Sequence, residues 1–278
     1  MINNNGNLFS PQAEILSTNR GFLFGDAVFE TMKIVDNSIL FLEDHYFRLM
    51  ASMRILRMEI PMNFTMEFFE SEILKTADFN SLNQSARARM TVYRNAGGLY
   101  TPKTNTISYI VETSALDSKL FRTSNNSYEI DLFKDFYIAK NLLSTLKTTN
   151  KLINIVGSIF AKENDLQNCL LLNDTKNIVE ALNGNLFMLM DNKLFTPPIS
   201  EGCLNGVMRK QILKITKKID SIEVTEVPIS PFDLQKADEI FITNSIVGIQ
   251  PVSKYRKKEY EQNFSNLVIE KLNQLIST

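Results

Sequence analysis

Lys147 stands at the end of the apolar run LLSTL and precedes TTN, where a helix is expected to begin. The amine of a lysine attacks a carbonyl only after it loses its charge, which a partly desolvated pocket favours. The same placement also suits a lysine that merely extends its charged end into solvent. Lys147 is therefore a candidate nucleophile whose partners must be sought elsewhere in the chain.

A lysine that binds a carbonyl cofactor such as pyridoxal phosphate needs a carboxylate for the pyridine nitrogen and a cradle for the phosphate. Glu180 lies in the apolar segment NIVEALNGN, where an ionised carboxylate needs a partner unless it faces solvent. Gly206 precedes a helical pattern whose first N–H groups would suit a phosphate. Asn244 and Ser245 follow a strand and offer further donors, and Arg48 offers a guanidinium.

Other kinds of catalytic or metal site have little support. The chain has one histidine, His45, which the helical pattern places at a helix surface or interface. Its two cysteines, Cys169 and Cys203, are too few for a disulfide framework or a zinc site and are expected to be buried thiols. The motifs GxGxxG, P-loop, HExxH and GxSxG are absent from the sequence, so we predict no metal site.

Composition narrows the class of partner. Thirty basic and 31 acidic residues give the 278-residue chain a net charge of −1, which favours a small molecule over nucleic acid or an anionic membrane. Its hydrophobic content of 44% is ordinary for a folded protein. The N-terminal sequence lacks the pattern of a secretory signal, and no long apolar run is present, so a cytoplasmic protein is expected.

The first part of the chain mixes strands and helices. The segments 27–35 and 38–45 read as strands joined at Asp36-Asn37, and 42–58 has the spacing of an amphipathic helix. Thr65 is a candidate N-cap for a second helix, and two further strands pair around a glycine-containing turn. These strands are 86–94 and 106–114.

A polar stretch, 116–127, interrupts these patterns and is the predicted linker between a domain of residues 1–115 and a larger one of residues 128–278. The second domain begins with a helix near 150–163 and continues with an irregular mixture of strands and helices. Such a mixture predicts an α+β fold in two parts rather than a regular doubly wound sheet.

Taken in order, several segments resemble the fold-type IV pyridoxal-phosphate enzymes, the class IV aminotransferase family. They span most of the chain: NRGFLFGDAVFETMKI, LEDHYFRLMASMRIL, LKTTNKL, NIVEALNGNLFML, FTPPISEGCLNGVMR and ADEIFITNSIVGIQPV. The resemblance implies a small N-terminal α/β domain and a larger C-terminal, barrel-like domain that carries the cofactor lysine. It also implies pyridoxal 5'-phosphate as cofactor, an amino-acid-like substrate and a homodimer.

The resemblance assigns roles to individual residues. Lys147 matches the lysine that forms the Schiff base and moves the proton, Glu180 the carboxylate at the pyridine nitrogen, and Arg48 the phosphate-binding arginine. The remaining cofactor contacts implied are Leu204 against the ring, the N–H groups of Val207 and Met208 at the phosphate, and Ser245 with Ile246 beside them. For the substrate carboxylate the candidates are Arg94, Tyr93 and Tyr100, of which Arg94 is equally consistent with a solvated turn residue.

Three activities share this scaffold, and the sequence favours 4-amino-4-deoxychorismate lyase, an enzyme of folate biosynthesis. Branched-chain aminotransferases typically have a tyrosine where this chain has Leu152, and D-amino acid aminotransferases an arginine and a histidine that NAGGLYTP lacks. Two stretches resemble the lyases: the run from Lys147 through Asn150, Lys151 and Leu152, and the run NSIVGIQPV. A third stretch, RNAGGLYTP, lacks the second arginine that is common in lyases. The aminotransferases stay open as alternatives. A non-catalytic binding relative is disfavoured because Lys147, Glu180 and Arg48 are all present.

Overall fold

The computed structural model describes residues 1–9, 17–123 and 126–276, which form two compact units. Unit 1 consists of residues 1–119 and 147–150, and unit 2 of residues 120–146 and 151–278. The chain first passes from one unit to the other between Lys119 and Leu120, inside the predicted linker 116–127, of which residues 124 and 125 lie outside the described residues.

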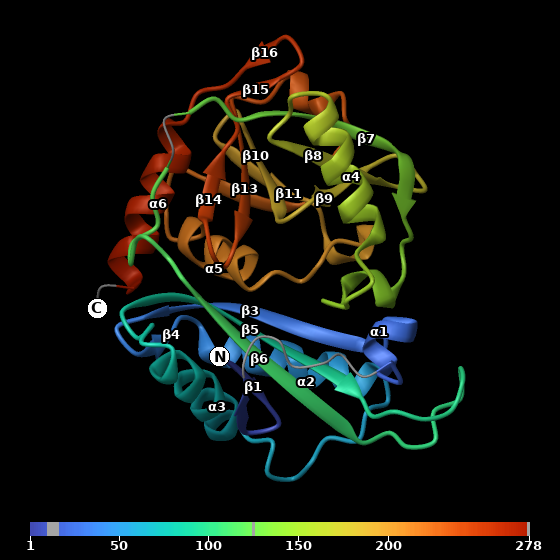
Figure 1. Cartoon of the computed structure of the whole chain (residues 1–278). Helices are drawn as coiled ribbons and strands as arrows, with labels where there is room; N and C mark the ends of the chain where they lie inside the picture. The colour runs from blue at the N-terminus through green and yellow to red at the C-terminus, as the bar shows by residue number, and fades with distance from the viewer. Residues whose placement is uncertain (10–16, 124–125, 277–278) are drawn as a thin grey trace. The chain divides into compact units, whose positions relative to one another are not determined.

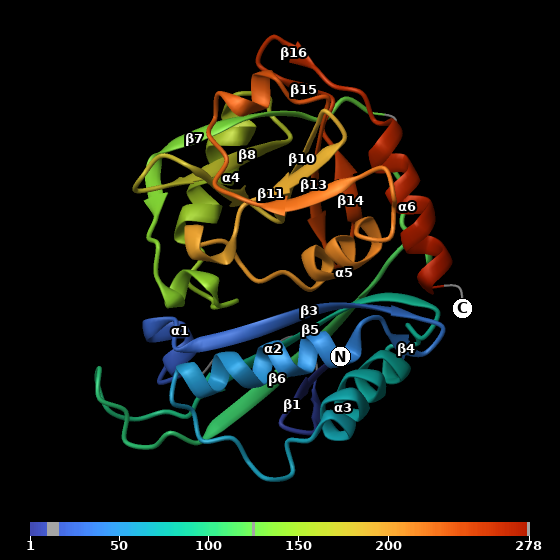
Figure 2. The same ribbon diagram turned by 180° about the vertical axis from the view of Figure 1, so that it is seen from behind.

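Unit 1 is a six-stranded antiparallel sheet with two long helices on one face (Figures 1 and 2). The order is β2-β1-β6-β5-β3-β4, formed by β1 (Ile2–Asn4), β2 (Asn7–Phe9), β3 (Ala27–Val35), β4 (Ser38–Ile39), β5 (Ser85–Arg94) and β6 (Ile107–Ala115). The helices are α1 (Arg20–Phe24), α2 (Leu42–Ile55) and α3 (Met66–Phe79). Residues such as Leu49 and Phe69 of the helices and Met32 and Met90 of the sheet fill a common core.

Local sequence explains these elements. Asp36 and Asn37 both have positive φ (48° and 59°), the left-handed conformation that joins β3 to β4 in a tight hairpin. The side chain of Thr65 accepts the N–H of Phe68 and caps α3 as predicted. The strand predicted over 38–45 is wrong beyond residue 39, because Phe41 turns with φ 58° and α2 begins at Leu42.

Unit 2 contains two five-stranded sheets (Figure 1). One has the order β12-β11-β10-β13-β14, from β10 (Asn185–Met190), β11 (Lys193–Thr196), β12 (Glu223–Glu226), β13 (Glu239–Asn244) and β14 (Gly248–Pro251). The other has the order β16-β15-β7-β8-β9, from β7 (Glu129–Ile138), β8 (Asn168–Asn173), β9 (Ile178–Ala181), β15 (Lys254–Tyr255) and β16 (Lys258–Glu259). Strands β9 and β10 are consecutive, so the two sheets meet at that hairpin.

One hydrophobic core joins the two sheets of unit 2 and gives them their barrel-like form. It includes Leu132 and Leu170 of one sheet and Leu186 and Ile240 of the other. Three helices cover the outside of the sheets: α4 (Leu152–Glu163), α5 (Val207–Thr216) and α6 (Asn263–Ile276). The 3-10 turns are η1 (Leu142–Thr145), η2 (Ile199–Glu201) and η3 (Asp233–Gln235). Within the described residues, no helix combines the length and apolarity needed to cross a membrane.

Candidate active site

Lys147 belongs to a short extension of the sheet in unit 1. The N–H of Phe29 donates to the carbonyl of Lys147 (2.9 Å), and the N–H of Thr149 donates to the carbonyl of Ala27 (3.1 Å). These bonds fix residues 147–149 beside the start of β3, which β4 leaves unpaired. The sequence had assigned Lys147 to the C-terminal domain, but this pairing groups it with unit 1. Its Nζ lies 4.6 Å from the centre of the Phe29 ring.

A buried carboxylate, Glu30 of β3, holds Arg48 and His45 of α2. Arg48 donates through Nε to Oε1 of Glu30 (2.7 Å) and through Nη2 to Oε2 (2.5 Å). This two-point geometry is the strongest way in which a guanidinium binds a carboxylate. The Nδ1 of His45 lies 2.7 Å from the same Oε2. The side chain of Glu30 is 1% exposed, so these partners, rather than water, stabilise its charge.

The pKa shifts follow from this arrangement. Burial raises the pKa of Glu30, but the charge of Arg48 and hydrogen bonds from Arg48 and His45 outweigh burial and lower it to about 2. Burial lowers the pKa of His45, against the opposing effect of Glu30. A neutral imidazole that donates Nδ1–H to Glu30 agrees with both directions. His45 is fully buried, so its prediction as a surface or interface residue is wrong.

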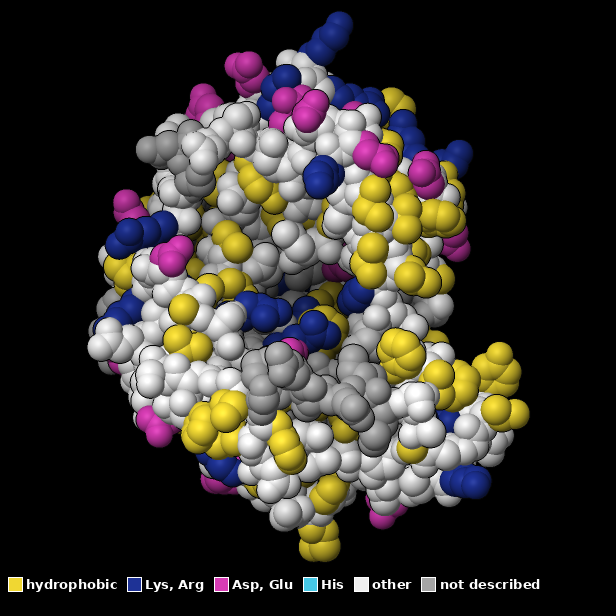
Figure 3. Space-filling model, in the orientation of Figure 1, with side chains coloured by type: hydrophobic (Ala, Val, Ile, Leu, Met, Phe, Trp, Pro, Cys, Tyr) yellow, Lys and Arg dark blue, Asp and Glu magenta, His cyan; other side chains and the backbone are white. Residues whose placement is uncertain are grey.

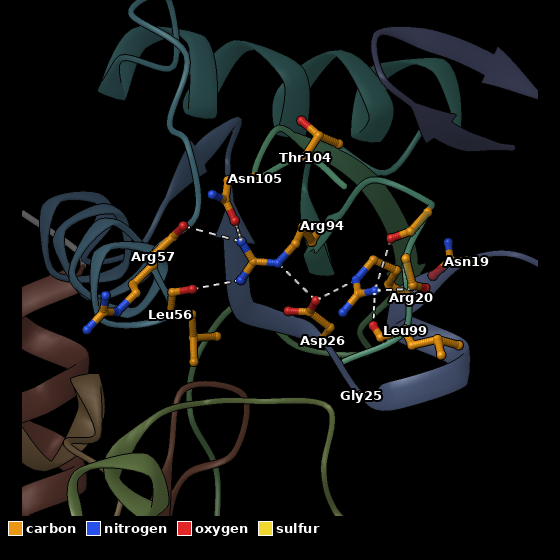
Figure 4. A network of polar contacts seen from close by, with 12 residues as sticks. Asn19, Arg20, Gly25, Asp26, Leu56, Arg57, Arg94, Leu99, Thr104 and Asn105 are labelled. Atoms are coloured by element: carbon orange, nitrogen blue, oxygen red, sulfur yellow. Dashed lines mark hydrogen bonds and ion pairs between the residues drawn. The ribbon is translucent and has the colours of Figure 1, made fainter. Parts of the chain in front are cut away.

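Arg94, the predicted substrate residue, is held by several protein groups in unit 1 (Figure 4). Its Nε donates to Asp26 (2.9 Å), its Nη2 to the carbonyl of Leu56 (2.7 Å), and its Nη1 to the carbonyl of Arg57 and to Oδ1 of Asn105. A substrate carboxylate would have to displace these partners. The geometry therefore favours a structural role for Arg94.

Asp26 joins Arg94 to a second buried arginine, Arg20 (Figure 4). Arg20 donates through Nε to Asp26 (2.9 Å), and its Nη1 reaches the carbonyls of residues 97–99, at 2.6 Å for Leu99. One carboxylate thus ties α1, the end of β5 and the following loop together. Arg94 and Tyr100 line a common pocket of about 370 Å³ beside this network, whereas Tyr93 does not.

In unit 2, Glu180 of β9 lies against the chain that precedes α5. Its Oε2 accepts the N–H of Leu204 (3.0 Å) and lies 3.5 Å from Nδ2 of Asn185. Asn185 also donates to the carbonyl of Leu204 (2.9 Å). Burial and the charge of Glu180 raise the pKa of the neighbouring Cys203 to about 12, so this thiol stays protonated at neutral pH. The structure therefore places Glu180 and Leu204 at one site.

The start of α5 is suited to an anion. Its N-cap, Gly206, provides no side chain, and the N–H groups of Val207 and Met208 donate to no group within the described part of the chain. Both residues are buried, and free N–H groups at a helix start bind phosphate. An added Cβ at Gly206 would lie 2.0 Å from Oδ1 of Asn185, so a larger residue does not fit there.

The turn after β13 carries the last predicted cofactor residues. Oδ1 of Asn244 accepts the N–H of Ile246 (3.0 Å) and of Val247 (2.9 Å), so the predicted Ile246 donor already has a partner. The hydroxyl of Ser245 has none among residues 1–9, 17–123 and 126–276. Nδ2 of Asn244 donates to the carbonyl of Asn183 (3.2 Å), which ties this turn to the β9–β10 turn near Glu180.

The groups present fit pyridoxal phosphate. Unit 1 carries an amine on an ordered strand, Lys147, and a guanidinium oriented by Glu30, that of Arg48. Unit 2 carries a carboxylate, Glu180, and free N–H groups at a buried helix start. These four kinds of group are what the cofactor's aldehyde, phosphate and pyridine nitrogen require.

The family model for amino-transferase class IV matches residues 27–255. The chain belongs to this family. A protein of Methanocaldococcus jannaschii named "Putative branched-chain-amino-acid aminotransferase" is 29% identical over 240 residues, 86% of this chain and 82% of that protein. The aminodeoxychorismate lyase of Vibrio harveyi is 23% identical, over 91% of this chain and 92% of its own.

Solved structures show the same fold. The branched-chain amino acid aminotransferase of Thermobaculum terrenum, solved in its pyridoxal-phosphate form, superposes with a TM-score of 0.85 at 20% identity. The match covers 99% of this chain and 93% of that one. The protein is therefore a fold-type IV pyridoxal-phosphate enzyme, a transaminase or lyase.

In this class IV enzyme, sequence reasoning missed the residues that hold the predicted ones in place. These residues are Asp26, Glu30 and Asn185, none of which is freely exposed to solvent. Each forms hydrogen bonds that orient a candidate residue. For Asp26 and Glu30 the available signal was a charge within the largely apolar stretch FGDAVFE, whereas the uncharged Asn185 offered no such signal. The same argument had singled out Glu180.

Replacing Glu30 tests its coupling to Arg48 and His45. Because the pKa of Glu30 is lower in the folded protein, its stabilisation is fully present above its ordinary pKa of 4.5 and is lost as pH falls toward about 2. We expect Glu30→Gln to be less stable than the wild type by roughly 3 kcal/mol at pH 7. Urea unfolding at several pH values should show this difference shrinking below pH 4.5; a difference independent of pH would contradict it.

Asp26→Asn tests the network of Figure 4. The substitution leaves Arg20 and Arg94 buried without their shared carboxylate, so we expect a loss of about 3 kcal/mol in the free energy of unfolding. Asp36→Asn is the control, because the ion pair of Asp36 with Lys119 is exposed and worth less than about 1 kcal/mol. Equal losses in the two variants, measured by urea unfolding, would argue against the network.

Proposed function

We propose that this enzyme cleaves 4-amino-4-deoxychorismate to p-aminobenzoate and pyruvate, a step of folate synthesis. The observation that carries the proposal is the segment from Lys147 through Asn150 to Leu152, which resembles that of the lyases. Nδ2 of Asn150 donates to the carbonyl of Gly25 (3.1 Å), and an added Cβ at Gly25 would lie 2.3 Å from Oδ1 of Asn150. Asn150 thus fixes the end of the lysine segment against unit 1.

Leu152 also supports the proposed lyase activity over branched-chain transamination. Branched-chain enzymes typically place a tyrosine hydroxyl at this position, whereas here the side chain is a leucine that is 76% exposed in unit 2. No hydroxyl is available from this residue. The lyase relative also aligns along nearly all of both chains, which supports the proposal without deciding between activities.

The chain's own groups have defined tasks in this proposal. Bound pyridoxal phosphate supplies the electron sink for a carbanion. The amine of Lys147 would remove the proton from the ring carbon that carries the amino group. The bond between the neighbouring ring carbon and the ether oxygen then breaks, the ring becomes aromatic, and the departing enolpyruvate takes up a proton to become pyruvate. Glu180 pairs with the pyridine nitrogen, while Arg48 and the N–H groups of Val207 and Met208 hold the phosphate.

For the substrate carboxylate we propose Tyr100 in preference to Arg94 or Tyr93. The side chain of Tyr100 is 91% exposed, and its ring packs at a tilt against Phe24 with the ring centres 5.9 Å apart, so its hydroxyl is accessible. Arg94 is fully engaged with Asp26 and backbone carbonyls, and Tyr93 is half-buried in β5.

Transamination of a branched-chain or D-amino acid is the second candidate. Higher sequence identity to the Methanocaldococcus jannaschii protein than to the lyase favours it. The two reactions share the proton transfer by Lys147 and differ in the next bond that changes. They are therefore separated by their products rather than by the cofactor residues.

The deciding assay supplies freshly generated 4-amino-4-deoxychorismate to the cofactor-loaded enzyme and follows p-aminobenzoate and pyruvate. We expect both in equal amounts, and we expect Lys147→Ala to lose at least about a thousandfold in kcat because its base is gone. Arg54→Ala is the control: this arginine is exposed on α2 and should leave turnover unchanged.

Absence of both products from a yellow, folded preparation would contradict the lyase proposal. Amino donors of either configuration would then be screened with a 2-oxo acid for transamination. Absence of any cofactor absorption, with no label trapped at Lys147 by borohydride, would instead favour a non-catalytic relative.

We further propose that the enzyme is a homodimer that buries the exposed apolar stripe of α4. Hydrophobic side chains gather over α4 in the space-filling view (Figure 3). The stripe has helical spacing and consists of Leu152, Ile155, Val156 and Ile159, each at least 37% exposed. A contiguous exposed apolar face of this kind is typical of a protein interface.

Introducing charge into this apolar stripe tests the dimer. We expect the wild type to have twice the 31.8 kDa mass of the chain in light scattering, and Ile155→Asp/Ile159→Asp to have the monomer mass. A buried charge without a partner opposes association. Met62→Asp, at an isolated and fully exposed methionine of unit 1, should stay dimeric. A wild-type monomer, or a dimeric double variant, would contradict the proposed interface.

A further inference from the structure

A separate pocket lies within unit 2. It has a volume of about 800 Å³ and is lined by residues of β7, of the turn between β8 and β9, of segment 230–235 and of the turn between β15 and β16. Pairing of β7 with β8 and β15, and of Ile229 with Ile178, brings these segments together (Figure 2). No residue proposed for the cofactor lines it. Pockets of this size bind small organic molecules.

An excess of positive charge distinguishes the lining of this pocket. Its charged side chains are Lys134, Lys176, Arg256 and Lys257, and no acidic residue lines it. The three lysine ammonium groups make no hydrogen bond or ion pair within the described residues, and Arg256 gives its Nε–H to Asp131 at 3.2 Å. Because the whole chain has a net charge of −1, this is a local excess that attracts an anion.

The rest of the lining includes apolar and aromatic side chains. Leu132 and Leu172 are buried, whereas Phe232 is 80% exposed and Tyr137 is 45% exposed. Single exposed hydrophobic residues are common on proteins, but here two aromatic rings border one cationic pocket. Aromatic rings pack favourably against flat apolar groups. The lining therefore suits a ligand that carries a ring as well as a negative charge.

We propose that this pocket, called here the basic pocket, binds a small aromatic anion, a planar ring that bears a carboxylate. The lysines and Arg256 contact the carboxylate, and Phe232 and Tyr137 pack against the ring. The site is distinct from the cofactor residues, and its ligand chemistry is independent of whether the enzyme is a lyase or a transaminase.

The test is isothermal titration calorimetry of the pyridoxal-phosphate-loaded enzyme with 2-naphthoate. Lys176→Glu/Lys257→Glu turns two attractions into repulsions and should raise Kd by about tenfold or more. Phe232→Ala removes a ring contact and should raise Kd roughly fivefold. The control, Lys217→Glu/Lys218→Glu, makes the same change in net charge at exposed positions after α5 and should leave Kd within about twofold of the wild type.

Three results would overturn the proposal. One is no binding of millimolar 2-naphthoate by the wild type. A second is the same Kd in every variant, which would place the naphthoate outside the basic pocket. Inorganic phosphate is titrated in parallel: a Kd as low as that of naphthoate, together with no effect of Phe232→Ala, would mark a plain anion site and also refute a ring-binding one. Lys134→Ala, a milder change on β7, repeats the test if the double reversal alters the melting temperature.

Discussion

Two carboxylates at the start of β3 fix the functional side chains of unit 1. Asp26 holds Arg20 and Arg94, and four residues later Glu30 holds Arg48 and His45. Between them, the backbone of β3 pairs with the segment that carries Lys147. A buried carboxylate is costly unless several donors satisfy it, so each of these positions is stable only with its partners in place. The placement of Lys147 and of Arg48, the arginine proposed for the cofactor phosphate, therefore depends on the same few residues around the start of β3.

In unit 2, a backbone N–H and a side-chain amide hold the Glu180 carboxylate. Glu180 accepts a backbone N–H from Leu204, and Asn185 reaches both Glu180 and the Leu204 carbonyl, so one side-chain amide links β9, β10 and the approach to α5. Directly after this link, Gly206 allows the helix to begin where its N–H groups stay free. Under the proposed roles, the N–H groups that hold Glu180 orient it without removing its charge, which a carboxylate that pairs with a pyridine nitrogen must keep.

Local features of the fold were predictable, and features that depend on distant partners were not. The Asp36-Asn37 turn and the Thr65 cap depend on residues next to one another in sequence, and both were predicted. The pairing of Lys147 with β3 joins residues more than a hundred positions apart, so no local pattern indicated that this lysine packs in unit 1. From its sequence position alone, Arg94 is interpreted as an exposed arginine at a strand end. The structure differs because the carbonyls of residues 56 and 57, which are distant in sequence, accept hydrogen bonds from it.

The cofactor residues alone do not determine the reaction. The roles proposed for Lys147 and Glu180, proton removal and pairing with the pyridine nitrogen, would serve transamination and lyase chemistry equally well, since both reactions begin by breaking the same kind of bond. Product choice depends instead on the groups that hold the rest of the substrate. Asp26 and Arg20 fix the loop of residues 97–99, which leads to Tyr100, the residue proposed for the substrate carboxylate. Under that proposal, a change in the arginine network of unit 1 would alter specificity while Lys147, Glu180 and the start of α5 stay as they are.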